Sequence, residues 1–216
     1  VHRLLDTLSF YGYVEQDGET NQYRLGWELY KIGQVVPQQN QLLNLNPGYI
    51  LELSRKTRAT VNLGILKRGE ILIISKIEGA YDSTHISVRP GEYEAIHATG
   101  MGKVMISEMD EEEIWGLFGG RETLIPYTPN TITSLPQLMR EEARVRESGY
   151  AVDAEEYCIG LYCIAMPIRD YTGQIVAAVS VSTPSGLMDE DRKKLILEAL
   201  SKCSRDISRS LGYQEK

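Results

Sequence analysis

The stretch from Cys163 to Thr183 contains two apolar runs on either side of Asp170-Tyr171-Thr172-Gly173, four residues that favour turns. This pattern predicts an antiparallel hairpin in a protein core. A four-residue loop would place Cys163 opposite Ser180, and a two-residue loop would place it opposite Ser182. Side chains alternate along a strand with a period of two, so in either register the thiol and both hydroxyls share one face, unless a bulge intervenes.

Two hydroxyls on one face of a core strand need an explanation. A buried hydroxyl without a hydrogen-bonding partner costs about 1–3 kcal/mol. One interpretation is a half-solvated face on which the serines meet water. However, Ala165 and Ala178 fall on the same face, and small residues around polar groups are typical of the floor of a ligand cavity. A polar ligand would then provide the missing partners.

A second segment, His97–Ile106, has a glycine-containing turn that leads directly into an expected helix. The free amides of Gly100, Met101 and Gly102 at the helix start would form a cradle for a carboxylate or phosphate. The segment is not a P-loop, because that motif needs glycine where His97 stands. A simple packing turn is the alternative, and we interpret Lys103 as a solvated helix residue.

Asp153 closes a short expected strand, ten residues before Cys163. It belongs either to the acidic, solvated run of residues 153–156 or to the ligand cavity. In the second case its carboxylate would accept a hydrogen bond from a hydroxyl-bearing or protonated ligand.

Composition narrows the class of protein. The 216 residues are 42% hydrophobic and 25% charged, with a net charge of −7, which indicates a soluble globular protein. We find no run of eighteen apolar residues and no leader, so we expect no membrane contact. Three cysteines without a CxxC motif favour a reducing, cytoplasmic location, and three scattered histidines predict neither a metal site nor a cofactor.

The N-terminal residues have a pattern of their own. Residues 1–8 follow helical spacing, and residues 13–25 read as two short strands around a turn, which together resemble the back half of a winged helix-turn-helix. Residues 47–216 alternate further strands and helices and predict an α+β domain with an antiparallel sheet flanked by helices. We place the boundary after residue 36, giving domains of residues 1–36 and 37–216.

Several blocks of this sequence resemble the IclR-type family of bacterial transcriptional regulators. They are Val1-His-Arg-Leu-Leu5, Gly12-Tyr-Val-Glu15, Tyr23-Arg-Leu-Gly26, Thr99-Gly-Met-Gly-Lys103, Gly149-Tyr-Ala-Val-Asp153, Glu155-Glu156, Gly160–Ala165, Pro167-Ile168, Gly173 and Ser180-Val-Ser182. The match runs in order along the whole chain, and only the front half of the DNA-binding domain has no counterpart.

The resemblance implies a partial winged helix-turn-helix followed by a GAF-like effector domain. It implies operator DNA and a small carboxylate effector (an organic, sugar or aromatic acid) as partners, and a homodimer or homotetramer. The family's effector pocket corresponds to Gly100, Met101, Asp153, Cys163, Ser180 and Ser182, with an apolar wall expected from residues 83–88. The candidates for DNA contact are His2 and Arg3 on the helix and Arg24 on the wing. Residues 1–34 carry three basic and five acidic side chains, so we expect this part to bind DNA weakly.

Two other classes of function stay open at this point. Cys163 would be the nucleophile of a hydrolase if a base such as His97 lay within reach of a thiolate, although nothing in the sequence aligns the two. The chain would alternatively be a stand-alone module that binds a small molecule. We expect a regulator, with no catalytic residue.

Overall fold

The computed structural model describes residues 2–39, 42, 44, 47–80 and 88–214, and the chain forms two compact units, Val1–Asn44 and Leu45–Lys216. The boundary that we expected after residue 36 falls inside a short helix, α3 (Val35–Gln39). Among the described residues, no helix combines the length and the apolar character needed to cross a membrane.

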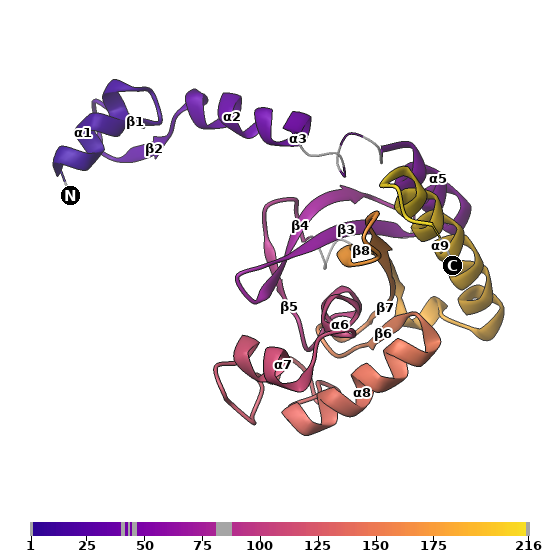
Figure 1. The fold of residues 1–216 in the computed structure, drawn as a ribbon. Coiled ribbons are helices and arrows are strands. Elements are labelled where there is room, and N and C mark those ends of the chain that lie inside the picture. The colour runs from indigo at the N-terminus through magenta and orange to yellow at the C-terminus, as the bar shows by residue number, and fades with distance from the viewer. Residues whose placement is uncertain (1, 40–41, 43, 45–46, 81–87, 215–216) are drawn as a thin grey trace. The chain divides into compact units, whose positions relative to one another are not determined.

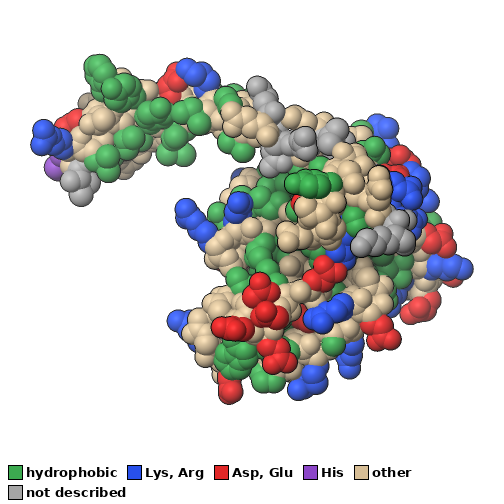
Figure 2. Space-filling view, viewed as in Figure 1, with side chains coloured by type: hydrophobic (Ala, Val, Ile, Leu, Met, Phe, Trp, Pro, Cys, Tyr) green, Lys and Arg blue, Asp and Glu red, His purple; other side chains and the backbone are tan. Residues whose placement is uncertain are grey.

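The first unit is a helix followed by a two-stranded hairpin and two short helices (Figure 1). Strands β1 and β2 pair antiparallel, with Val14 opposite Leu25. The side chain of Asp17 accepts hydrogen bonds from the amides of Glu19 and Thr20, which stabilises the turn between them. Large apolar side chains remain exposed on this unit (Figure 2). Trp27 is one of them. Its elements are α1 (His2–Phe10), β1 (Val14–Gln16), β2 (Tyr23–Leu25), α2 (Trp27–Gly33) and α3.

The second unit is an α+β domain built on a six-stranded antiparallel sheet, with strand order β5-β4-β3-β8-β7-β6. Figure 1 shows the sheet curled around α6, with α9 packed outside it. This is the antiparallel, helix-flanked architecture that we expected. The elements are α5 (Pro47–Thr57), β3 (Thr60–Lys67), β4 (Glu70–Ile77), β5 (Tyr93–Ala95), α6 (Gly100–Ile106), α7 (Glu111–Leu117), α8 (Leu135–Ser148), β6 (Ala151–Ala154), β7 (Leu161–Arg169), β8 (Ile175–Pro184), the 3₁₀ turn η1 (Ser185–Leu187) and α9 (Glu190–Ser210).

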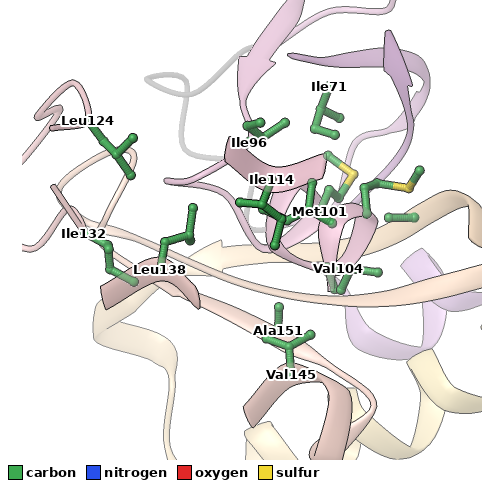
Figure 3. Close-up of a cluster of buried hydrophobic side chains, with 14 of the residues drawn as sticks. Ile71, Ile96, Met101, Val104, Ile114, Leu124, Ile132, Leu138, Val145 and Ala151 are labelled. Carbon is green, nitrogen blue, oxygen red and sulfur yellow. The ribbon is translucent and has the colours of Figure 1, made fainter. Parts of the chain in front are cut away.

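Alternation along the central strands separates the two faces of this sheet. Val179 and Val181 of β8 are fully buried on one face, and α9 packs against β7 and β8. Ala178 and Ser180 alternate with them and point to the opposite face, towards α6. The core on the α6 side includes Met101, Val104, Ile71 and Ala151 (Figure 3).

Helix α6 is completely buried, and glycines allow it to lie this deep. A Cβ added to Gly102 would lie 2.2 Å from the carbonyl oxygen of Ile96, which is too close for any other residue type. A Cβ added to Gly100 would lie 3.3 Å from the Cβ of Ala165 on β7. The glycines of the Thr99–Lys103 motif therefore bring the start of α6 against the sheet.

The hairpin of β7 and β8 adopts the register of the shorter loop, with Cys163 opposite Ser182 and Ala165 opposite Ser180. Beside the turn the register shifts, because Arg169 pairs with Ile175 while Ile168 pairs with Ala177. This bulge lies at the turn end of the hairpin. Side chains therefore alternate regularly from Cys163 to Ile168 and along the facing part of β8. The thiol and the two hydroxyls share a face, as predicted.

Candidate functional site

A pocket lies between the start of α6 and the polar face of the sheet, and it encloses about 40 Å³ of free space. At roughly 10–15 Å³ per molecule, this space holds a few waters and suits a small ligand. All six residues that we assigned to an effector site line it. The complete lining is Thr60, Asn62, Val88, Glu94, Thr99, Gly100, Met101, Asp153, Tyr157, Leu161, Cys163, Ser180, Ser182, Thr183 and Pro184.

The floor of the pocket presents hydroxyl groups. The Cys163 thiol donates to Ser182 Oγ over 3.3 Å, and the Asn62 amide approaches the same oxygen at 3.4 Å. Ser182 therefore accepts from two neighbours and keeps its own proton for a further partner. Ser180 is also buried, and its hydroxyl makes no hydrogen bond to another described residue. Both serines can donate into the cavity.

The helix start offers fewer amides than the sequence suggested. The side chain of Thr99 caps α6 by accepting from the amide of Gly102 over 3.2 Å. The amides of Gly100 and Met101 precede the first intrahelical bond and are not used by this cap. The expected three-amide cradle is therefore reduced to two.

Two carboxyl groups face the same cavity. Asp153 Oδ1 accepts from the amides of Glu156 (2.7 Å) and Tyr157 (3.3 Å), which fixes its orientation. Burial raises the pKa of Asp153 to about 7, against the lowering effect of these amides. Burial, with the neighbouring charge of Asp153, likewise raises the pKa of Glu94 to about 7. The pocket therefore combines donors at the helix and the floor with carboxyl groups at the side.

Lys103 is not the solvated helix residue that we expected, because it is completely buried. Its ammonium group donates to the carboxylate of Glu156 and to the backbone oxygen of Val152, each over 2.5 Å. Since α6 runs through the middle of the domain, a charged residue on any of its faces must find a buried partner. The pair with Glu156 joins α6 to the turn that holds Asp153.

The arrangement does not support a cysteine hydrolase. Burial raises the pKa of the Cys163 thiol well above its usual value, so the thiol stays protonated and weakly nucleophilic. His97 does not line this pocket, because its ring faces a separate cavity and bonds through Nε2 to the backbone oxygen of Ile125 over 2.9 Å. Burial also lowers the pKa of His97. The thiol therefore lacks the charge that attack requires, and the described residues of the pocket bring no histidine to it as a base.

Several lining residues were missed by sequence reasoning. Asn62 and Thr60 reach the pocket because β3 pairs with β8, which places Asn62 opposite Ser180 and Thr60 opposite Ser182. Glu94 arrives from the edge strand β5. No local pattern marks these positions, since only the pairing of distant strands brings them here. The apolar wall expected from residues 83–88 lies outside the described residues except for Val88, which does line the pocket.

The three candidates for DNA contact lie in the first unit. His2 and Arg3 are exposed on α1. Arg24 on β2 is exposed but forms an ion pair with Glu15 on β1, with 2.7 Å between Nη2 and Oε2. Arg3, unlike Arg24, has no carboxylate within ion-pair distance among the described residues.

Comparison with known proteins decides the family. Residues 35–209 match the family model described as bacterial transcriptional regulator IclR C-terminal. The chain belongs to the IclR family. It is 37% identical to the HTH-type transcriptional regulator XynR of Escherichia coli, over 99% of this chain and 84% of that protein. It is 35% identical to KdgR of E. coli, over 100% of this chain and 81% of that protein.

Solved structures agree with this assignment. The C-terminal domain of E. coli KdgR matches with a TM-score of 0.73 and 33% identity, over 81% of this chain and 100% of that structure. An IclR homologue from Microbacterium hydrocarbonoxydans, solved in complex with 4-hydroxybenzoate, shares the fold (TM-score 0.82, 21% identity, 97% of this chain and 84% of that one). The IclR-family member described here is thus a transcriptional regulator, and the relatives that it matches are regulators rather than enzymes.

Proposed function

We propose that this IclR-family protein binds a small carboxylate in the pocket between α6 and the sheet, and that the ligand alters its binding to operator DNA. The observation that carries the proposal is the convergence of free donors on one enclosed space. The amides of Gly100 and Met101 meet the hydroxyls of Ser180 and Ser182 there. Such donors stabilise an anion, and hydrogen bonds to a charged group are worth about 1.5–3 kcal/mol each.

The other predicted site residues, Cys163, Asp153 and Met101, each have a role in this proposal. Cys163 fixes the oxygen of Ser182 and shapes the floor, because its thiol is protonated. Asp153 faces the other end of the ligand. Met101 is a flexible side chain that adapts the pocket to its occupant. The 4-hydroxybenzoate bound by the Microbacterium homologue is an acid of the class that we propose, although this pocket suits a smaller one.

The proposed regulation is a shift between two arrangements of the protein. A ligand moves such an equilibrium only by binding one arrangement more tightly than the other. The N-terminal unit would place α1, with Arg3, in the major groove and the β1–β2 wing against the backbone. We propose that the regulator acts in the cytoplasm as a homodimer or homotetramer, so that paired units read paired half-sites.

A thermal-unfolding screen of small carboxylates tests the ligand proposal. An acid that binds the folded protein at 100 times its Kd should add about 2.7 kcal/mol to the free energy of unfolding. Replacing both serines (S180A/S182A) should weaken binding at least about tenfold, since roughly 1.4 kcal/mol corresponds to a factor of ten. The control is S210A, which removes a hydroxyl that bonds to the backbone of α9. If an acid stabilises the double variant as much as the wild type, it does not bind at this site.

A further inference from the structure

The pocket contains more acid than base. Glu94 and Asp153 both line it, whereas the described residues of its lining include neither lysine nor arginine nor histidine. Two described cations neighbour lining residues: Arg192 donates to Thr183, and Lys76 stands opposite Asn62 in the sheet and forms an ion pair with Glu78. The ammonium group of Lys103 donates to Glu156 and Val152. A further buried carboxyl, Glu142, also lies within its electrostatic influence. An anionic ligand would therefore meet two carboxyl groups in a lining whose described residues carry no cation.

The two carboxyl groups differ in their surroundings. Asp153 accepts from two backbone amides, which favour its ionised form. The Glu94 carboxyl receives no hydrogen bond from the described residues. Glu94 on β5 pairs with Ile71 on β4, β4 pairs with β3, and β3 pairs with β8. Residues opposite one another in a sheet share a face, so this register places the Glu94 side chain on the same face as Ser180. Glu94 is thus the group that best carries a proton, and that proton would point into the cavity.

We infer that Glu94 is a specificity-determining residue that holds a proton and uses it to donate a hydrogen bond to the bound carboxylate, so that ligand binding is linked to proton uptake. This inference rests on the proposed function, because it concerns the same pocket. The proton comes from solvent and resides on the Glu94 carboxyl, while the ligand remains a carboxylate. A neutral Glu94 changes from a repelling charge into a donor opposite the serine hydroxyls. Its raised pKa, about 7, agrees with this role.

The described residues that line the pocket with Glu94 are all acidic or neutral. Burial is the main cause of its raised pKa, and the charges of Asp153 and of Glu92 on its own segment add to it. Tyr157 lies across the pocket, and its own pKa is raised, so it stays neutral. Lys103 acts on Asp153 from α6 and lowers its pKa. No described group opposes protonation of Glu94 as strongly as the two amides oppose protonation of Asp153.

The first test needs no ligand. Carboxyl carbons of the 216-residue chain are titrated by NMR, and the Glu94 signal is identified by its absence in Glu94→Gln. It should titrate about two pH units or more above the exposed glutamates. A Glu94 signal that titrates with the exposed glutamates overturns the inference and leaves the proposed function intact.

The second test uses two probes of matched size, glycolate and glycine, at pH 6–9. Glycolate should bind, and above the titration point of Glu94 its association constant should fall by up to about tenfold per pH unit, the slope of one proton taken up. Glu94→Gln should bind glycolate with a flat profile, because glutamine supplies a donor without titrating. Glu70→Gln, an exposed change on the neighbouring strand β4, should keep the wild-type slope.

The other outcomes distinguish a failure of the inference about Glu94 from a failure of the proposed function. Binding of glycine in preference to glycolate would mean an ionised acid pair that selects an ammonium group, which overturns the inference. A slope that survives in Glu94→Gln but vanishes in Asp153→Asn would place the proton on Asp153 and overturn it as well. If Glu94 titrates high but neither glycolate nor any acid of the screen binds, the proposed function fails and the inference fails with it.

Discussion

At the scale of single residues, the side chain that most defines this domain is Lys103. It is fully buried on α6, and its bond to Glu156 connects the helix to the turn after β6. That same turn supplies the two amides that hold Asp153 at the pocket. The lysine therefore supports the proposed ligand site without lining it.

Replacing Lys103 should lower the free energy of unfolding. In Lys103→Met the carboxylate of Glu156 would be left buried without its partner, and breaking a buried pair in this way costs about 3–5 kcal/mol. Urea unfolding at neutral pH measures the change. Lys202→Met removes an exposed lysine that bridges Glu52 and Asp206, and it should leave the midpoint unchanged. Equal effects of the two substitutions would contradict the structural role of Lys103.

How well the sequence predicts the place of a single side chain depends on how far apart in the chain the interacting residues lie. Alternation along β7 and β8 was enough to place Cys163, Ser180 and Ser182 together, because it needs only the neighbouring strand. Asn62 and Glu94 depend on the pairing of strands far apart in the chain, which local pattern does not encode. Lys103 was misjudged because nothing in its motif reveals that every side of α6 is covered.

At the scale of elements, α8 carries a buried acid that the pocket does not use. Glu142 is almost completely buried, and neither of its carboxyl oxygens has a hydrogen-bonding partner among the described residues. Burial raises its pKa to about 9, against the opposing charge of Lys103. At neutral pH this carboxyl is therefore protonated in the folded protein and ionised in the unfolded chain.

Because of this difference in protonation, Glu142 on α8 makes the stability of the protein depend on pH. Between the ordinary pKa of 4.5 and about 9, folding takes up a proton at Glu142, so its contribution to stability is complete below pH 4.5 and is lost as pH rises towards 9. Glu142→Gln should remove this loss and stabilise the protein at pH 8 by at least about 1.4 kcal/mol, the value of one pKa unit. Urea midpoints at pH 5 and pH 8 report the effect. Glu147→Gln, an exposed change on the same helix, should reproduce the wild-type pH dependence.

At the scale of the whole molecule, the chain consists of two units of different character. Residues 45–216 contain the six-stranded sheet, its flanking helices and all the described residues that line the pocket. The first unit is small, and many of its large apolar side chains are exposed. The larger fold followed from the alternation of expected strands and helices, whereas the order of strands in the sheet did not, because it is set by long-range pairing.

The larger unit should therefore fold and bind its ligand alone. A chain of residues 45–216 should unfold in one cooperative transition and keep the carboxylate affinity of the 216-residue chain within about twofold. The separately solved C-terminal domain of KdgR is a precedent among the relatives. Calorimetry and ligand titration of both chains measure this. A broad transition, or loss of the ligand response, would show that the first unit contributes to the site.

The alternation of β8 has a consequence for how such a regulator diversifies. Val179 and Val181 anchor the sheet to α9, while Ser180 and Ser182, one position away, face the cavity. If the proposed site is the effector site, substitutions at the even-numbered positions should change ligand preference while the odd-numbered positions preserve the scaffold. A single strand thus separates the positions that would set ligand preference from those that hold the sheet against α9, so the first can change in evolution without loss of the second.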